Sequence, residues 1–416
     1  MLEGVRKFFS KQSKNFIVLL FRRGYTSLFN NIPMQYTSLY MKTLGVKEIG
    51  IGYLRSLGDI ASTIISPFLG FIADVKSLKK ALMIAMAIEV VAPLFYLFAW
   101  DWQLLTLAVI FSTLTLNIGG IVEVVYIANS LRRTTRATGF GVINTVSIIA
   151  SLIAPIIAAF IVEQFGGITT NGIRPLFIIQ FFGLALLAPI TLIFLKDIKG
   201  SGKKFNLKED FKSMFNILRN RRWLQRWVIV EALGGYVWGT TTPYIMIYAV
   251  EYKGASPWIL GIMGTILNAF SFASSIPIGR LGDKIGRIKT LVMIRPAFHL
   301  SLLLFIFAPN PYFLIIAWAF RGIFFSSMAL WQTIAMELVP EEERGRWSGI
   351  KGFLSGLARI PSSIVGGYMW TYLGPQTPFI AALIIDLFIR LPLLYMTPET
   401  LKKKEYFEMY SGAQNN

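Results

Sequence analysis

The sequence predicts an all-α membrane protein, in which twelve transmembrane helices form two pseudo-symmetric bundles of six, with both termini in the cytoplasm. Composition, the length of the apolar runs and an internal repeat support this fold class. Of the 416 residues, 54% are hydrophobic and only 15% are charged, too few charges to cover a soluble protein of this length. Most of the chain consists of apolar runs of about 20 residues or more, the length that crosses the hydrocarbon core of a bilayer.

The apolar runs place the spans in order along the chain. The first six are expected at 15–41, 49–73, 81–99, 103–128, 138–163 and 175–195. The second six are expected at 223–250, 257–279, 289–308, 311–337, 347–373 and 377–397. A polar segment separates the two sets. We therefore expect an N-terminal bundle at 1–195, a cytoplasmic linker at 196–222, a C-terminal bundle at 223–397 and a cytoplasmic tail at 398–416.

The positive charges indicate how the spans are oriented. The formal net charge is +19, and Lys and Arg gather in the two tails, the linker and every second connection. The alternate connections hold only Lys42, Lys47, Arg174 and Lys253. Because cytoplasmic loops are rich in Lys and Arg, the tails and the linker are expected in the cytoplasm. We expect the linker to be half amphipathic helix and half tether, in contact with anionic lipid rather than with nucleic acid.

Two pairs of segments show that the halves repeat. The loop GFIADVKSLKK, from Gly70, closes the second span as GRLGDKIGRIK, from Gly279, closes the eighth. A segment of the fifth span from Gly141 matches one of the eleventh span from Gly349 at nearly the same offset. Glycine-rich loops can bind phosphate, but such a loop follows a strand in a soluble domain. We therefore predict tight hairpins between membrane helices, in which glycines supply the turn.

The second of these loops carries a more specific pattern. It matches G-x-L-x-D-[RK]-x-G-[RK] at Gly279, Leu281, Asp283, Lys284, Gly286 and Arg287. On this loop, the twelve spans and the repeat, the sequence resembles the major facilitator superfamily over nearly its whole length. In the first copy, Val75 and Ser77 depart from the pattern.

The resemblance implies a multi-pass protein of the cell membrane that works as a monomer. It also implies a cytoplasmic gate motif, in which Asp74 and Asp283 help to latch the outward-open state. The motif would consist of Gly70, Asp74, Gly279, Asp283, Gly286 and Arg287.

Two further patterns resemble those of the drug:proton antiporter branch. Small residues and a proline recur along the fifth span at Gly141, Ala150, Ala154, Pro155, Ala158 and Ala159. A packing face of small residues would look the same. The ending TPETL at 397–401 has a related form in sugar porters, but the signature that sugar porters carry after the sixth span is absent.

Ionisable side chains inside a span are costly and are therefore candidates for function. Asp59 and Arg359 lie near the middle of the second and eleventh spans, which face each other in this family. They could form a salt bridge between the halves that protonation of Asp59 opens. Alternatively, Arg55, one turn earlier, pairs with Asp59 within its own helix.

Glu123 and Glu231 are the other acidic candidates for proton coupling, because the fourth and seventh spans line the cavity in this family. The repeat aligns Glu231 with Arg23, so that these two side chains would meet as an inner gate. Alternatively, Arg22 and Arg23 extend to the lipid headgroups.

Polar and aromatic side chains near mid-span are the candidates for contact with a solute. They are Asn30, Asn31, Gln35, Asn117, Tyr236, Trp238, Asn268, Arg321, Trp331 and Gln332. Arg321 would contact an anionic solute or form a structural ion pair. We interpret His299, in a peripheral span, as a hydrogen-bonded packing residue. With one His and no Cys in the chain, we expect no metal site and no cofactor.

These features favour a secondary transporter that exports small organic or amphipathic compounds by alternating access, coupled to protons. A proton-coupled importer of a sugar or an organic acid is an alternative on the same scaffold. A receptor or scaffold that transports nothing is an alternative of another class. We expect no enzyme, because the sequence shows no metal-ligand cluster, nucleophile–base pair or nucleotide loop. The expected partners are a small-molecule substrate, protons and the lipid bilayer.

Overall fold

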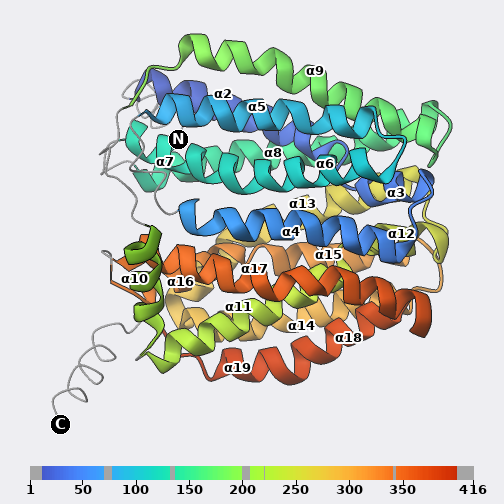
Figure 1. Cartoon of the computed structure of the whole chain (residues 1–416). Coiled ribbons are helices and arrows are strands. Elements are labelled where there is room, and N and C mark those ends of the chain that lie inside the picture. Colours follow the sequence, from blue (N-terminus) through green and yellow to red (C-terminus); the bar gives the residue numbers. More distant parts are fainter. Residues whose placement is uncertain are drawn as a thin grey trace.

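The computed structural model describes residues 12–69, 77–131, 136–198, 207–219, 221–340 and 343–400. In these ranges the regular secondary structure is helical, without strands. The long helices run side by side, and those of the N-terminal half lie next to those of the C-terminal half (Figure 1).

The helices of the N-terminal half form the first group. They are α2 (Lys14–Asn31), α3 (Thr37–Thr43), α4 (Glu48–Leu69), α5 (Leu78–Leu97), α6 (Trp102–Leu114), the π-helical η2 (Thr115–Gly119), α7 (Gly120–Ser130), α8 (Arg136–Gln164) and α9 (Thr170–Phe194). The linker contributes α10 (Leu207–Arg219), where the sequence predicts an amphipathic helix.

The helices of the C-terminal half form the second group. They are α11 (Arg222–Thr241), α12 (Ile245–Glu251), α13 (Pro257–Ile285), α14 (Arg287–Ile306), α15 (Phe313–Phe325), α16 (Met328–Glu337), α17 (Arg344–Tyr368), η5 (Met369–Leu373), α18 (Thr377–Ile385), η6 (Asp386–Arg390) and α19 (Leu391–Tyr395). We call the end of the molecule that holds α10, the start of α2 and the end of α19 the linker end (Figure 1). The other end, which holds α3 and α12, is the opposite end.

Short polar side chains start several of these helices. At an N-cap, a side-chain oxygen accepts a hydrogen bond from a backbone N–H of the first turn that has no partner in the helix. Five residues do so in the described chain: Ser13, Ser77, Asp101, Thr169 and Ser256. These five helix starts are therefore specified locally.

Eight helices of the described chain are long and apolar enough to cross a membrane. Four others of 18 residues or more, α2, α4, α11 and α17, carry charged side chains along their length, which lower their mean hydropathy. The count of twelve spans therefore remains a prediction, as do the domain boundaries and the side on which the termini lie.

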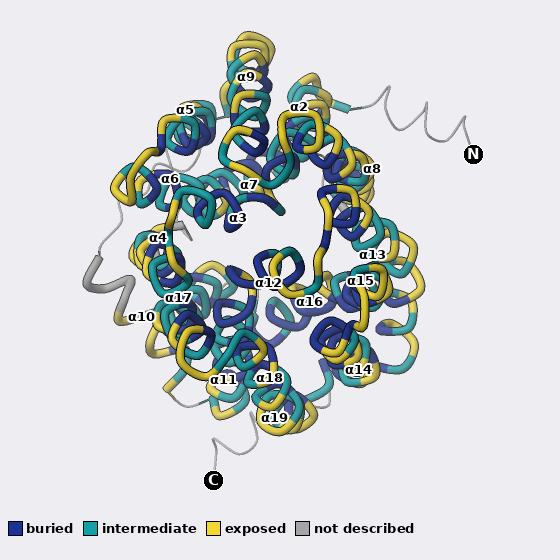
Figure 2. The backbone as a smooth tube through the Cα atoms, turned by 90° about the vertical axis from the view of Figure 1, so that its right-hand side faces the viewer, coloured by how far each residue is buried: buried dark blue, intermediate teal, exposed yellow. Residues whose placement is uncertain are grey.

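The outer surface of the molecule is apolar. Large hydrophobic side chains are exposed along the outer helices, among them Ile193, which is 74% exposed in α9, and Met293 in α14. Figure 2 shows exposed positions on the outward sides of these helices and buried positions on their inward sides. Exposed apolar surface of this extent suits contact with lipid tails.

Six of the predicted spans contain a break or a π-helical segment. The first is broken between α2 and α3, near Pro33, and the seventh between α11 and α12, at Pro243. Proline has no N–H to donate and clashes with the preceding turn, so both prolines account for a break. The tenth is broken between α15 and α16, and the fourth, eleventh and twelfth contain the π-helical η2, η5 and η6. The sequence analysis treated all six as single, regular spans. In transporters built from repeats, solutes bind where such discontinuous helices meet.

Candidate functional site

The two groups of helices contact each other through α4 and α17. Nε of Arg359 lies 2.8 Å from Oδ1 of Asp59, and the side chain of Asp59 is 14% exposed and that of Arg359 34%. The structure therefore brings together the two charges that the sequence analysis paired. The alternative pair is not formed, because Arg55 donates a hydrogen bond to Ser38 instead and makes no ion pair among the described residues.

Small residues allow α4 and α17 to approach closely. A Cβ atom at Gly52 would lie 2.5 Å from the carbonyl oxygen of Ser363, and one at Gly367 would lie 2.9 Å from the carbonyl oxygen of Glu48. In the same contact, Ser56 donates a hydrogen bond to the carbonyl of Ile360 across the two groups. The Asp59–Arg359 pair therefore lies within a close backbone contact that holds both side chains in position.

A second contact joins α8 and α13. Asn268 donates a hydrogen bond to the carbonyl of Ser151 at 3.0 Å, and Thr265 donates to that of Leu152 at 2.8 Å. Asn31 donates to Oγ of Ser151 at 3.3 Å. Asn268, predicted to contact a solute, therefore contributes to the contact between the groups, whereas Asn31, also predicted to contact a solute, bonds Ser151 within its own group.

Small residues in the second half of the fifth span belong to this second contact, whereas Gly141, near its start, has open space around it. Ala154, Ala158 and Ala159 are buried, and a Cβ atom at Gly261 would lie 2.7 Å from that of Ala159. Close helix packing therefore accounts for these positions.

A cluster of charges joins the groups at the opposite end. Lys42, just beyond the first predicted span, forms an ion pair with Glu48 of its own group. It also lies 3.2 Å from Glu251 of the second group. Burial alone would lower the pKa of Lys42, but the two carboxylates outweigh it and raise that pKa above its ordinary value. Lys42 therefore stays charged and holds this end together.

Replacing Lys42 by Gln is expected to open the opposite end part of the time. The chain has no cysteine, so that Lys47→Cys and Tyr252→Cys, two exposed positions of the two groups, can carry spin labels without background. Double electron–electron resonance measures the distance between the two labels. In Lys42→Gln a larger fraction of molecules should show a long distance between them than in the protein with Lys42 intact.

Arg174→Gln serves as the matched control for Lys42→Gln. Arg174 lies at the same end and bonds Tyr40 within its own group. Its removal should leave the distance distribution unchanged. An unchanged distribution in Lys42→Gln as well would show that the charge cluster does not hold the two groups together.

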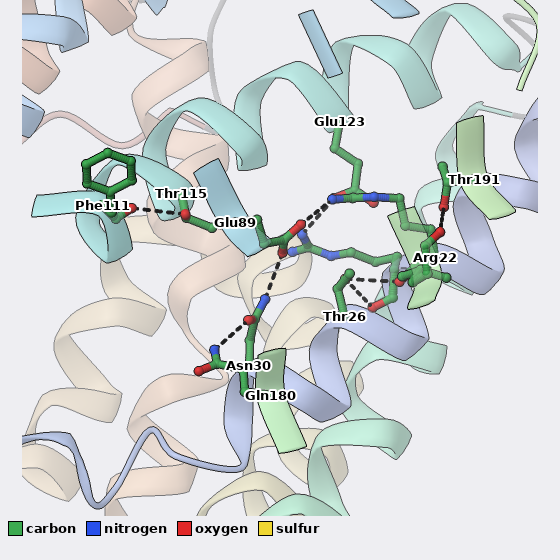
Figure 3. Close-up of polar contacts among 11 residues, drawn as sticks. Arg22, Thr26, Asn30, Glu89, Phe111, Thr115, Glu123, Gln180 and Thr191 are labelled. Atoms are coloured by element: carbon green, nitrogen blue, oxygen red, sulfur yellow. Dashed lines mark hydrogen bonds and ion pairs between the residues drawn. The ribbon is translucent and has the colours of Figure 1, made fainter. Parts of the chain in front are cut away.

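A buried polar network connects α2, α5, α7 and α9 within the first group (Figure 3). Arg22 lies 2.6 Å from Glu89 and 2.8 Å from Glu123, and Arg23 lies 3.2 Å from Glu123. Asn30 donates a hydrogen bond to Glu89 at 2.9 Å. Two buried carboxylates thus face two guanidinium groups, so that their charges balance.

This network corrects two expectations about the first span. The side chain of Arg22 is 3% exposed and does not extend to lipid headgroups, whereas that of Arg23 is 43% exposed. Arg23 does not meet Glu231, which lies 3.5 Å from Lys351 within the second group. The repeat aligned Arg23 with Glu231 but could not show that a partner in the same half lies closer.

The network also contains residues that the sequence analysis did not single out. Glu89 lies in α5, and Gln180 of α9 donates a hydrogen bond to Asn30 at 3.0 Å. An acid within an apolar run is a visible signal, and Glu89 could have been found by that rule alone.

A second buried network lies in the other group, around Asp386. This carboxylate is 0% exposed and lies 2.9 Å from Arg295, 2.8 Å from His299 and 3.1 Å from Arg390. His299 is therefore buried and hydrogen-bonded, as expected of a packing residue. Arg295, Asp386 and Arg390 were missed, although each is an ionisable residue inside a predicted span.

Two aromatic candidates of this group, Trp238 and Trp331, lie against its arginines. The guanidinium of Arg321 lies 5.3 Å from the ring centroid of Trp238 and 5.5 Å from that of Trp318. Trp331 is buried between Arg295 and Arg390, so that it packs inside the group rather than facing a solute.

The remaining solute candidates are dispersed. Asn117 donates a hydrogen bond to Thr113 one turn back, within the fourth span. Gln35 is half-buried beside Gly264 of the second group. Tyr236 is half-buried and Gln332 is exposed. The structure therefore does not gather all ten candidates at one place.

The gate motif of the second group forms the predicted hairpin. Gly286, with φ of 113°, is the one residue between α13 and α14, and a side chain would be strained there. Asp283 is 71% exposed and lies 3.8 Å from Arg287, which also pairs with Glu337 of α16. Gly279 has open space around it. The first copy, with Gly70 and Asp74, lies outside the described residues.

The TPETL ending contacts this hairpin. The carboxylate of Glu399 accepts hydrogen bonds from the backbone N–H groups of Arg287 at 2.7 Å and Ile288 at 3.0 Å. An acid at a helix N-terminus satisfies free N–H groups and interacts favourably with the helix dipole. Glu399 therefore caps α14 from a distant part of the chain.

Replacing Glu399 by Ala is expected to lower the free energy of unfolding by about 1–2 kcal/mol, the cost of losing a charged cap. Glu399→Gln should cost less, because its amide oxygen still accepts one of the bonds. Thermal unfolding of the purified protein in detergent measures both. If Glu399→Ala melted as wild type does, the cap would contribute nothing.

Two groups of helices with apolar outer faces and interrupted, charge-bearing inner helices define a multi-pass transport protein of the cell membrane. The chain belongs to the Major Facilitator Superfamily, whose family model matches residues 24–298 and 253–409. This confirms the predicted family and its helical fold. The superfamily is one of transporters and not a class of enzymes.

Curated relatives carry the name multidrug resistance protein MdtG. The protein of Proteus mirabilis is 26% identical over 67% of this chain and 68% of its own length. That of Rahnella sp. is 26% identical over 63% of this chain and 64% of its own length.

Solved structures share the fold at lower identity. A mutant of the nucleoside transporter NupG matches 92% of this chain and 100% of its own with a TM-score of 0.74 and 16% identity. A D-xylose-proton symporter matches 94% of this chain and 99% of its own with a TM-score of 0.67 and 14% identity. Similarity at this level of identity supports the fold but does not identify the solute that the protein binds.

Proposed function

We propose that the protein is a secondary active transporter that exports a small organic or amphipathic solute by alternating access, in exchange for protons. The observation that carries this proposal is the Asp59–Arg359 ion pair, because it joins the two groups of helices at the middle of the molecule. A charge pair at this place can be switched by a single proton, since a neutral Asp59 attracts Arg359 less strongly.

This pair supports coupling to protons in the following way. With Asp59 charged, Arg359 is held and the groups stay in contact along α4 and α17. A proton on Asp59 weakens the pair and lets the groups separate there. The distribution of Lys and Arg supports a cytoplasmic position for the linker end. The names of the MdtG relatives support export of organic compounds.

Transport by the reconstituted protein tests the proposal. Liposomes loaded with a pH-sensitive dye would receive a panel of organic cations, sugars and organic acids. Export in exchange for protons requires proton movement opposite to that of the solute. Proton movement in the same direction would instead indicate an importer, and tracer flux without any proton movement would show that coupling is absent.

A further inference from the structure

Arg321 differs from the other buried arginines of the second group. It is 5% exposed, and its guanidinium lies against the rings of Trp238, Trp318 and Phe298. Among the described residues it makes no hydrogen bond and no ion pair. The sequence analysis left open whether Arg321 forms a structural ion pair, and the structure shows ring contacts only.

The neighbouring arginines, Arg295 and Arg390, have hydrogen-bond partners that account for their burial. Arg295 donates two hydrogen bonds to Asp386, both at 2.9 Å. Arg390 bonds the same carboxylate and also the carbonyl of Val230. One buried carboxylate thus serves two guanidinium groups and His299, and none of its contacts reaches Arg321. This part of the molecule therefore carries an excess of positive charge.

Arg321 and Trp238 lie close to the helix interruptions. Trp238 lies three residues before the end of α11, and Arg321 lies four residues before the end of α15. Trp238 is only half-buried, and the edge of its ring contacts Phe325 at a centroid distance of 5.4 Å. The interrupted seventh and tenth spans thus bring a cation and aromatic faces to the same depth, where transporters of this design bind solutes.

We propose that Arg321, with Trp238, Trp318 and Phe298, binds the carboxylate of an amphipathic or aromatic organic anion. The inference rests on the proposed transport function and names the class of solute. A guanidinium presents a planar fork of N–H donors that matches a carboxylate. The rings around it suit the apolar or aromatic remainder of such a solute.

Binding of a matched pair of probes tests this site. Naphthalene-2-carboxylate and naphthalene-2-carboxamide share shape and aromatic surface and differ in charge. Equilibrium dialysis against the purified protein, with protein-free micelles subtracted, should give a dissociation constant about tenfold or more lower for the carboxylate, as expected of a charge-assisted pair. Equal affinities in wild type would overturn the proposal.

Substitutions test whether Arg321 is responsible for the preference for the carboxylate over the carboxamide. In Arg321→Gln the preference for the carboxylate should disappear, and Arg321→Lys should keep part of it, because it retains the charge without the fork. Arg55→Gln is the matched control, since Arg55 also lies inside a predicted span without an ion pair among the described residues, and should keep the full preference. Loss of the preference in Arg55→Gln, or its persistence in Arg321→Gln, would refute the site.

This test is independent of the transport assay. If binding shows a carboxylate preference that depends on Arg321, but the liposomes show no proton movement, the proposed site is supported and proton exchange is refuted. If only cations drive proton exchange in liposomes, and binding shows no carboxylate preference, the proposed function is supported and this site is refuted.

Discussion

Asp59→Asn is expected to reduce solute-driven proton movement in liposomes to the level of protein-free vesicles. Asn has nearly the shape of Asp but cannot take up a proton, so that the contact with Arg359 would no longer depend on protonation. The measurement compares proton movement and tracer flux of wild type and variant under the same gradient.

The control for Asp59→Asn is Glu163→Gln. Glu163 is an exposed acid at the end of α8 and forms no ion pair among the described residues. The substitution Glu163→Gln should leave solute-driven proton movement unchanged. Full proton movement in Asp59→Asn, with the variant folded, would show that another group carries the proton, and Glu123 and Glu231 would be the next acids to replace.

Asp386→Asn is expected to have the largest effect on stability, a loss of about 3–5 kcal/mol in the free energy of unfolding. The substitution leaves Arg295 and Arg390 buried without the carboxylate that both contact. Thermal unfolding in detergent measures the loss.

Two comparisons test the Asp386 network. Asp283→Asn removes an acid whose side chain is 71% exposed, and should change stability by no more than about 0.5 kcal/mol. Combining Asp386→Asn with Arg295→Met should cost less than the sum of the single changes, because the pair is removed together. A small effect of Asp386→Asn alone would mean that its partners find other acceptors.

Some features of the candidate site could be predicted because they depend on nearby sequence or on the repeat. The Asp59–Arg359 pair followed from two charges at mid-span in helices that face each other in the family. The hairpin at Gly286 followed from the spacing of glycines and charges, because a left-handed backbone there needs a glycine. His299 was expected to be a hydrogen-bonded packing residue, and it lies against Asp386.

Other features of the site could not be predicted. Several side chains face distant residues: Asn268 bonds the backbone of α8, and Glu399 caps α14. The interruptions of six spans were also missed, because a long apolar run does not show where the regular pattern of its backbone hydrogen bonds changes or breaks.

The sequence alone determined the class of the protein, its helical fold and the starts of several helices. Hydrophobic run length, caps and turns are local properties that act over a few residues. Only the tertiary structure decided which buried charges balance one another. Glu123 pairs with Arg22 and Arg23, whereas Arg321 contacts rings alone. The reason is physical: an ion pair depends on distances of a few ångströms between helices, and helix packing sets those distances.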